Sequence, residues 1–218
     1  MELRAAIKRL PFAPSAYALM RLLRGRNARF ASDYRQNSGA GSNLEATRAI
    51  SHSLPGLVDS LSVRSMLDIP CGDFLWMHHV DLGSVTYMGA DVIETLILSH
   101  ERLYGSPQRK FRTLDIITSD LPEVDLIFCR DCLVHFSHRL VKRAVNNIKR
   151  NRSRYLLTTT FPGRATNAEI VTGNWRPLNL CAAPFNFPQP VRLISEGHPA
   201  PYEDKSLGLW RIDDLPTF

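Results

Sequence analysis

The sequence lacks an apolar run long enough to cross a bilayer, although 44% of its 218 residues are hydrophobic. A membrane-spanning helix needs about 20 consecutive apolar residues. The N-terminal region also lacks the continuous apolar stretch of a secretory signal peptide, because Pro11 and Pro14 interrupt it. This length and composition are typical of a globular protein of ordinary size, which we expect in the cytoplasm.

Cysteine is scarce, with four residues in the chain: Cys71, Cys129, Cys132 and Cys181. Cys129 and Cys132 form a C-x-x-C pair, but no second pair stands at a spacing that would complete a zinc site. We interpret the two as buried thiols at a strand end, with a redox pair as the alternative. The chain also lacks an Asp-Asp or Asp-Asn pair after the fourth predicted strand, where magnesium would prefer carboxylates. The sequence therefore predicts no metal.

Acidic residues are few in one part of the chain only. Residues 1–35 carry eight basic and two acidic residues, whereas the remainder carries 19 of each, so the net charge of +6 belongs to the N-terminal region. Apolar spacing predicts two short helices there, at residues 2–10 and 15–25. We therefore predict a basic helical arm over residues 1–35 and a second domain over residues 36–218. Such an arm could bind nucleic acid, the surface of an anionic membrane or an acidic partner protein. The alternative is that its charges form the solvated face of helices that pack on the domain.

From residue 64 onward, predicted strands alternate with helices. The predicted strands are 65–69, 85–90, 110–114, 125–129, 155–161, 191–195 and 206–212, and the helices are 94–104 and 140–150. Ser42 and Glu45 have capping-box spacing, which predicts an earlier helix from there to about Ser53. The crossovers indicate an α/β fold with a Rossmann-like, seven-stranded, mostly parallel sheet and helices on both faces. The last two strands have no helix between them, which predicts an antiparallel last strand.

Four acidic residues stand in order where the first four predicted strands end: Asp68, Asp91, Asp115 and Asp131. An open parallel sheet binds its ligand outside the carboxyl ends of its strands. Asp91 lies 23 residues beyond Asp68, the spacing of a carboxylate that binds ribose hydroxyls. Gly72 allows a ligand to approach the backbone closely. Because no G-x-G-x-x-G follows the first strand, a nicotinamide-dependent oxidoreductase is disfavoured.

Two motifs carry a resemblance to a known family. Leu67–Phe74 resembles the first motif of class I S-adenosylmethionine-dependent methyltransferases, with Pro70 and Phe74 in place of the first and last glycines. Val124–His135 resembles the fourth-strand motif of the same superfamily. The resemblance covers about residues 36–215 and suggests a bacterial subfamily of unassigned substrate. Further segments that carry it are Gly41–Glu45, Trp175–Leu180 and Lys205–Trp210.

The resemblance implies S-adenosylmethionine as the cofactor. The loop after the first strand would hold its methionine part, with Asp68 near the amino group. Asp91 would bind the ribose hydroxyls, and Asp115 with the backbone of Ile116 would bind adenine. Cys129 to Asp131 would line the path to the methyl group. The implied cofactor-binding residues are Asp68, Pro70, Cys71, Gly72, Asp73, Asp91, Asp115, Ile116 and Arg130.

Methyl transfer from a sulfonium requires a nucleophile aligned with the methyl carbon, and a hydroxyl nucleophile also benefits from a base. Asp131 and His135 are the predicted catalytic residues, because four-residue spacing would place them on one face of a helix that begins at Asp131. The alternative is a helix cap and a core histidine. The predicted substrate-binding residues are His138, Trp175, Arg176 and Asn179. Phe185 and Phe187 would add to this wall, and the alternative is a packed lid.

We therefore predict a methyltransferase that acts on a hydroxyl of a small molecule or glycan, as a monomer or homodimer. One alternative is an RNA methyltransferase that uses the basic arm and a second basic stretch. That stretch comprises Arg139, Lys142, Arg143, Lys149, Arg150, Arg152 and Arg154. Another alternative is a non-catalytic protein that binds the cofactor.

Overall fold

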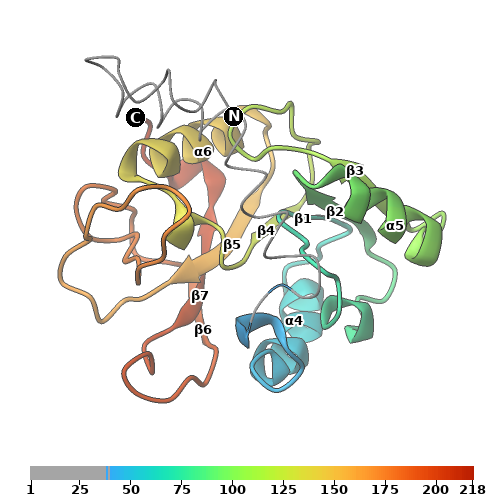
Figure 1. The fold of residues 1–218 in the computed structure, drawn as a ribbon, viewed down its shortest axis with the longest axis horizontal. Helices are drawn as coiled ribbons and strands as arrows, with labels where there is room; N and C mark the ends of the chain where they lie inside the picture. Colours follow the sequence, from blue (N-terminus) through green and yellow to red (C-terminus); the bar gives the residue numbers. More distant parts are fainter. Residues whose placement is uncertain (1–37, 39) are drawn as a thin grey trace, which may run out of the picture. The chain divides into compact units, whose positions relative to one another are not determined.

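The computed structural model describes Ser38 and residues 40–218 (Figure 1). The predicted basic arm and its two helices lie outside the described residues. The strands are β1 (Ser65–Asp68), β2 (Thr86–Asp91), β3 (Arg109–Thr113), β4 (Leu126–Cys129), β5 (Tyr155–Thr160), β6 (Arg192–Ser195) and β7 (Ser206–Arg211). The α-helices are α4 (Arg48–Ser60), α5 (Glu94–Tyr104) and α6 (His138–Arg150). No helix in this described part is long and apolar enough to span a bilayer.

The seven strands form one sheet in the order β3-β2-β1-β4-β5-β7-β6. β1 to β5 run parallel to one another, whereas β7 runs antiparallel to both β5 and β6. The predicted fold, a mostly parallel seven-stranded sheet with an antiparallel last strand, is confirmed. The strand order reverses between β1 and β4, so the crevice at their carboxyl ends is the expected ligand site of this topology.

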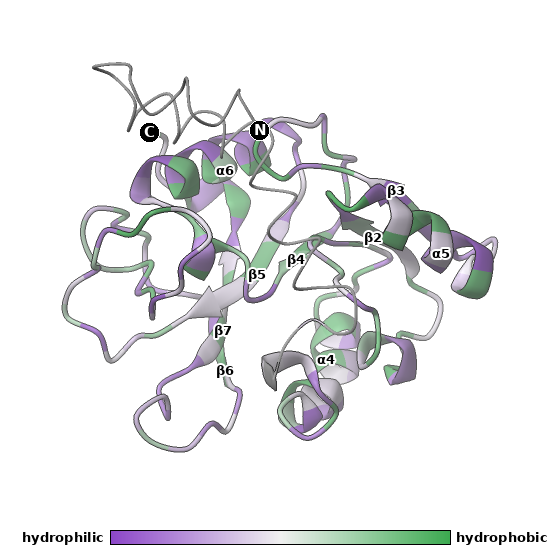
Figure 2. Ribbon diagram, in the orientation of Figure 1, coloured by the Kyte–Doolittle hydropathy of each residue, from purple (hydrophilic) through white to green (hydrophobic). Residues whose placement is uncertain are grey.

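Helices cover both faces of the sheet, as predicted. One core cluster joins Leu54 of α4 and Ile97 of α5 to alternate strand residues such as Met66 and Phe128. Figure 1 shows α4 and α6 on opposite sides of the sheet. The hydrophobic and hydrophilic residues of α6 separate onto two sides (Figure 2), because residues three and four apart share a helix face.

The first described α-helix begins later than the sequence predicted. The N-cap of α4 is Thr47, and the helix continues through Pro55 to Ser60. The backbone N–H of Ala46 donates to Oδ1 of Asn43 at 2.8 Å, so Asn43 organises a turn where a Ser42–Glu45 capping box was predicted. Burial of apolar residues in the last turns of α4 stabilises the helix beyond the predicted end.

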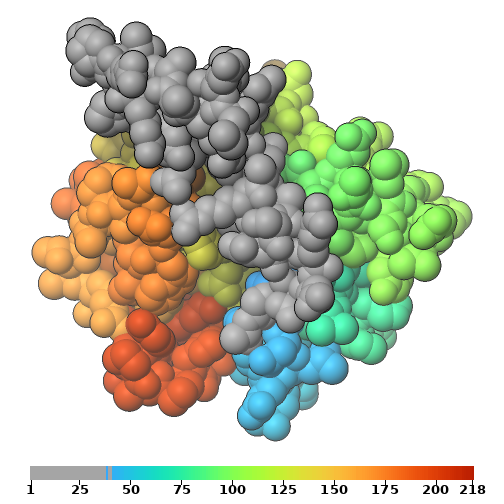
Figure 3. Space-filling view, viewed as in Figure 1, coloured from blue at the N-terminus to red at the C-terminus, as the bar shows by residue number. Residues whose placement is uncertain are grey.

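The hairpin between β6 and β7 lies beside the segment that leads into β1. β6 contacts α4, and Figure 3 shows the surfaces of residues 195–205 (red) and 40–60 (blue) side by side. Both segments therefore approach the carboxyl end of β4, where the predicted site lies.

Candidate functional site

The loop after β1 is held between the two neighbouring strands. The N–H of Ile69 donates to the carbonyl of Phe128 at 2.9 Å, and the N–H of Cys71 donates to the carbonyl of Ala90 at 2.8 Å. Gly72 has a φ of +54°, and a Cβ there would lie 2.4 Å from Oγ of Ser38. The loop therefore needs glycine at this position, for its backbone conformation and for the close approach of another group.

Asp73 presents a donor and an acceptor side by side. Its carboxylate Oδ2 accepts from the N–H of Ser38 at 2.7 Å, and its own N–H donates to Oγ of Ser38 at 2.7 Å. The amino group of an amino acid is a donor and its carboxylate an acceptor, so the two groups could bind the carboxylate and the backbone N–H of Asp73, respectively. The loop thus has the polar groups and the glycine cradle that the methionine part of the implied cofactor requires.

Asp68 is buried at the end of β1. The hydroxyl of Tyr87 donates to its Oδ2 at 2.6 Å. Burial raises the pKa of Asp68 to about 7, with a further contribution from Asp91, against the opposing effects of the Tyr87 hydrogen bond and the Arg130 charge. The carboxyl is therefore half-protonated near neutral pH, and a cationic group placed beside it would favour ionisation.

Asp91 and Asp115 lie next to each other at the carboxyl edge. The N–H of Leu114 donates to the carbonyl of Asp91 at 3.1 Å, which joins the two strand ends. Burial raises the pKa of Asp91, although backbone N–H groups donate to its carboxylate. Oδ1 of Asp115 accepts from the N–H of Ile117 at 2.9 Å. The carbonyl of Ile116 accepts from Asn147 at 2.9 Å, so only the rest of its backbone remains for the predicted adenine contact.

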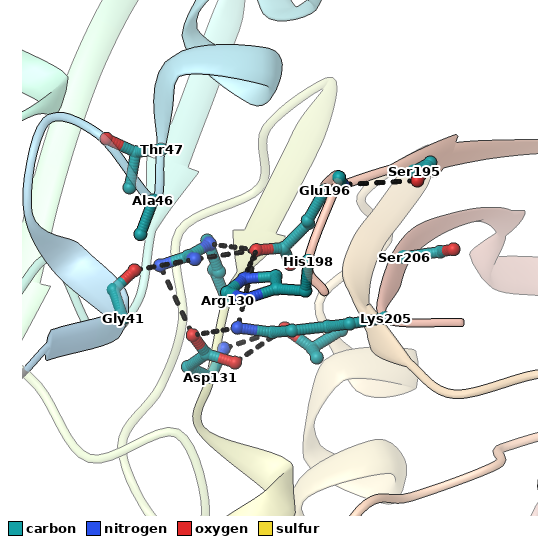
Figure 4. Close-up of polar contacts among 12 residues, drawn as sticks. Gly41, Ala46, Thr47, Arg130, Asp131, Ser195, Glu196, His198, Lys205 and Ser206 are labelled. Carbon is teal, nitrogen blue, oxygen red and sulfur yellow. Dashed lines mark hydrogen bonds and ion pairs between the residues drawn. The ribbon is translucent and has the colours of Figure 1, made fainter. Parts of the chain in front are cut away.

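Four charged side chains meet at the end of β4, and we call Arg130, Asp131, Glu196 and Lys205 the ion cluster (Figure 4). Arg130 donates to Oε2 of Glu196 at 2.6 Å and to the carbonyl of Gly41 at 2.8 Å. It also lies 3.2 Å from Oδ2 of Asp131. These contacts occupy the guanidinium and argue against the predicted cofactor contact of Arg130. It instead joins the β6–β7 hairpin and the segment around Gly41 to β4.

Asp131 has a φ of +50°, a left-handed conformation that non-glycine residues seldom adopt. Its N–H donates to Oγ1 of Thr159 at 2.8 Å, and its Oδ2 accepts from Nζ of Lys205 at 2.7 Å. Burial opposes ionisation, but the charges of Arg130 and Lys205 hold the pKa of Asp131 below its ordinary value. An ionised carboxylate in two ion pairs is a weak base, which argues against a role of Asp131 in taking a proton.

His135 does not share a helix face with Asp131, contrary to the prediction. It ends a short 3-10 helix (Leu133–His135), and α6 begins only at His138. Nδ1 of His135 donates to the carbonyl of Asn174 at 3.0 Å, so a neutral imidazole carries its proton on Nδ1 and its lone pair on Nε2. Burial lowers the pKa of His135, against the attraction of Asp131, so the ring is neutral at pH 7.

Arg176 and Asn179, predicted to bind substrate, hold the backbone of the surrounding loops. Both side chains are buried. The amide of Asn179 donates to the carbonyls of Arg164 and Pro162 at 2.8 and 3.3 Å. Arg176 donates to the carbonyls of Leu133, Val134, Phe136 and Ala168. These contacts commit the guanidinium of Arg176 and the amide of Asn179 to carbonyls of the protein itself, which argues against the predicted substrate contacts of both residues.

The other two predicted substrate residues differ from each other, because protein groups hold the ring of His138 whereas the ring of Trp175 is exposed. Nδ1 of His138 lies 2.8 Å from Glu169 and Nε2 donates to the carbonyl of Ala168 at 3.1 Å, so its ring is also committed. Phe185 and Phe187 are buried and belong to the core instead of a substrate wall. Trp175 is 41% exposed, and its ring packs edge-on against Tyr202 and Phe161. Among the four predicted substrate residues, Trp175 alone presents its side chain to solvent to this extent.

Sequence reasoning missed Glu196 and His198, because neither stands at the end of one of the first four strands. A signal existed for Lys205, which begins a segment that carries the family resemblance. Cys129 and Cys132 are free, buried thiols, which confirms that interpretation of the C-x-x-C pair. Within Ser38 and residues 40–218, no three His, Cys, Asp or Glu side chains form a group that could hold a metal ion.

Neither protein-family models nor curated proteins match the chain. Solved structures match it by fold. The Burkholderia thailandensis 1,6-didemethyltoxoflavin N1-methyltransferase, with bound S-adenosylhomocysteine, has a TM-score of 0.62 at 16% identity over 91% of this chain and 88% of its own. The Synechocystis magnesium protoporphyrin IX methyltransferase, with bound S-adenosylmethionine, has a TM-score of 0.54 at 16% identity over 87% and 95%.

Human N-acetylserotonin methyltransferase, also in complex with S-adenosylmethionine, has a TM-score of 0.54 at 14% identity over 74% of this chain. The chain spans about half the length of this human enzyme, 51%. Likeness at such low identity is a likeness of fold. The chain has the fold of S-adenosylmethionine-dependent methyltransferases, as its motifs implied.

Proposed function

We propose that this chain is a methyltransferase that binds S-adenosylmethionine. The observation that carries the proposal is the loop after β1, with Gly72 in a left-handed conformation, next to the point where the strand order reverses. Asp68, Asp91 and Asp115 follow in order along the same edge. Proteins of this fold that were solved with S-adenosylmethionine or S-adenosylhomocysteine support the choice of cofactor.

The loop residues would hold the cofactor by its polar groups. Asp73 would accept from the amino group and donate its backbone N–H to the carboxylate, replacing Ser38 at those positions. Asp68 would add a second carboxylate near the amino group, Asp91 would accept from the ribose hydroxyls, and Asp115 would contact adenine. When bound, the cofactor supplies an activated methyl group for in-line displacement.

We propose a hydroxyl of a small molecule or glycan as the methyl acceptor. His135 is the proposed base, because its neutral ring carries a lone pair on Nε2. Asp131 would stabilise the imidazolium that forms when His135 takes the proton. Trp175 adjoins Asn174, the hydrogen-bond partner of His135, and its exposed ring would support a sugar or aromatic ring of the acceptor.

The RNA methyltransferase alternative has less support from the described residues. Four of the seven basic residues in the stretch around α6 contact the protein itself: Lys142, Lys149, Arg150 and Arg154. Basic side chains that contact the protein itself are less available to bind the phosphate groups of RNA. A salt titration of binding to bulk RNA tests this alternative, because phosphate contacts weaken steeply with salt.

Isothermal titration calorimetry with S-adenosylmethionine, S-adenosylhomocysteine and NAD tests the main proposal. We expect saturable binding of the first two and none of NAD. A chain that gives no heat with either sulfur compound is not a methyltransferase of this kind. Binding with no turnover on any acceptor, and no change in any property when His135 is replaced, would favour a non-catalytic cofactor-binding protein.

A further inference from the structure

Two buried polar atoms of the β6–β7 hairpin lack hydrogen-bond partners. Within the described part of the chain, the side-chain atoms in this condition are Nε of Arg164, Oε1 of Glu196 and Nε2 of His198. Glu196 and His198 stand two residues apart, and the side chain of Glu196 is 0% exposed. Buried polar atoms of native proteins almost always have partners, so two neighbouring exceptions point to a group that binds between them.

The ion cluster does not need Oε1 of Glu196. The other oxygen, Oε2, accepts from Arg130 at 2.6 Å and lies 3.3 Å from Nζ of Lys205. Nε2 of His198 lies 3.6 Å from the same Oε2, beyond hydrogen-bond distance. The two cations and two carboxylates of the cluster balance, so no further charge is required. Oε1 of Glu196 is therefore an acceptor without a donor, and in the tautomer that carries its proton on Nε2, His198 adds a donor without an acceptor (Figure 4).

We infer that Glu196 and His198 bind a hydroxyl group of the methyl acceptor. A hydroxyl donates one hydrogen bond and accepts another, so its O–H would donate to Oε1 of Glu196 while its oxygen accepts from Nε2 of His198. The inference rests on the proposed methyltransferase function. Both residues follow β6, and the two cations that pair with Glu196 also pair with Asp131, which precedes the 3-10 helix that ends at His135.

The inference narrows the class of acceptor. His135 is the proposed base for the atom that becomes methylated, so the hydroxyl on Glu196 and His198 is a second one. The acceptor therefore carries at least two hydroxyl groups, as a sugar or an aromatic diol does, and is not a simple monohydroxylated compound. A site built to bind a hydroxyl rejects an analogue that lacks it, because its polar groups then stay unpaired.

Matched pairs of acceptors test the inference, with S-adenosylhomocysteine production as the readout. The probes are catechol against phenol, and a methyl glucoside against its monodeoxy analogues. We expect a preference in kcat/KM of at least about 100-fold for the fully hydroxylated member of one pair. His198→Leu should reduce this preference at least about tenfold, and His198→Gln, which retains an N–H donor, should restore part of it.

Glu196→Gln is the second test variant, and Glu203→Gln, exposed in the same hairpin, is the matched control. Dissociation constants for S-adenosylhomocysteine and melting temperatures should stay unchanged in His198→Leu. A preference that survives in His198→Leu, or the absence of any preference in the wild-type protein, overturns the inference, and the two atoms then hold only water. Failure to bind S-adenosylhomocysteine at all refutes the proposed function instead, so the two failures are distinguishable.

Discussion

The carboxyl of Asp68 should make the stability of this protein depend on pH in an unusual direction. Burial raises its pKa from 3.8 to about 7 in the folded protein. Between these values the unfolded chain has lost the proton and the folded protein still holds it. The free energy of unfolding contributed by Asp68 is therefore largest below pH 4, falls as the pH rises, and levels off above 7.

The size of the effect follows from the shift. About three pKa units at 1.36 kcal/mol each correspond to about 4 kcal/mol, a large part of the stability of a domain. Asp68→Asn keeps the shape and an acceptor for the Tyr87 hydroxyl but has no proton to lose. Relative to the wild-type protein, the variant should therefore become more stable by about 4 kcal/mol as the pH rises from 4 to 8.

Urea unfolding followed by tryptophan fluorescence measures this difference, since the chain has three tryptophans. Both proteins are unfolded at several values between pH 4 and 8, and the variant-minus-wild-type difference is plotted against pH. Subtracting the two curves removes the titration of all groups that both proteins share. A difference that stays flat across this range, or that favours the wild-type protein at high pH, refutes a raised pKa for Asp68.

Four further substitutions give separate expectations. Gly72→Ala should destabilise the protein by about 1–3 kcal/mol in thermal unfolding, because alanine resists a φ of +54°. Asp91→Asn should weaken S-adenosylhomocysteine binding about 10- to 100-fold by calorimetry, whereas the exposed control Asp213→Asn leaves it unchanged. His135→Asn should lower kcat with unchanged S-adenosylhomocysteine affinity, and wild-type activity should rise with pH through a midpoint below 6.5. Despite partial burial, hydrogen bonds hold the pKa of Asp125 below its ordinary value. Asp125→Asn should therefore lower the free energy of unfolding by up to about 1 kcal/mol at pH 7, and by progressively less as the pH falls below 4.

The sheet and the positions of the acidic residues were predictable from the sequence alone. Strands and helices are encoded by the periodicity of apolar residues within short windows, and α5 begins and ends where the sequence predicted. Asp68 and Asp91 could be placed at one edge, because the carboxyl ends of parallel strands meet there. The start of α4 was predicted wrongly, since the Asn43 turn competes locally with the capping box.

The roles of individual side chains depended on contacts between distant parts of the chain. Asp131 pairs with Lys205, 74 residues away, which makes it a poor base. Arg176 resembles a ligand-binding residue in the sequence, and only the folded loops show that carbonyls 40 or more residues away occupy it. The same holds for Glu196 and His198. Their unpaired atoms arise from burial, and burial is decided by the packing of the whole chain and not by any short stretch of it.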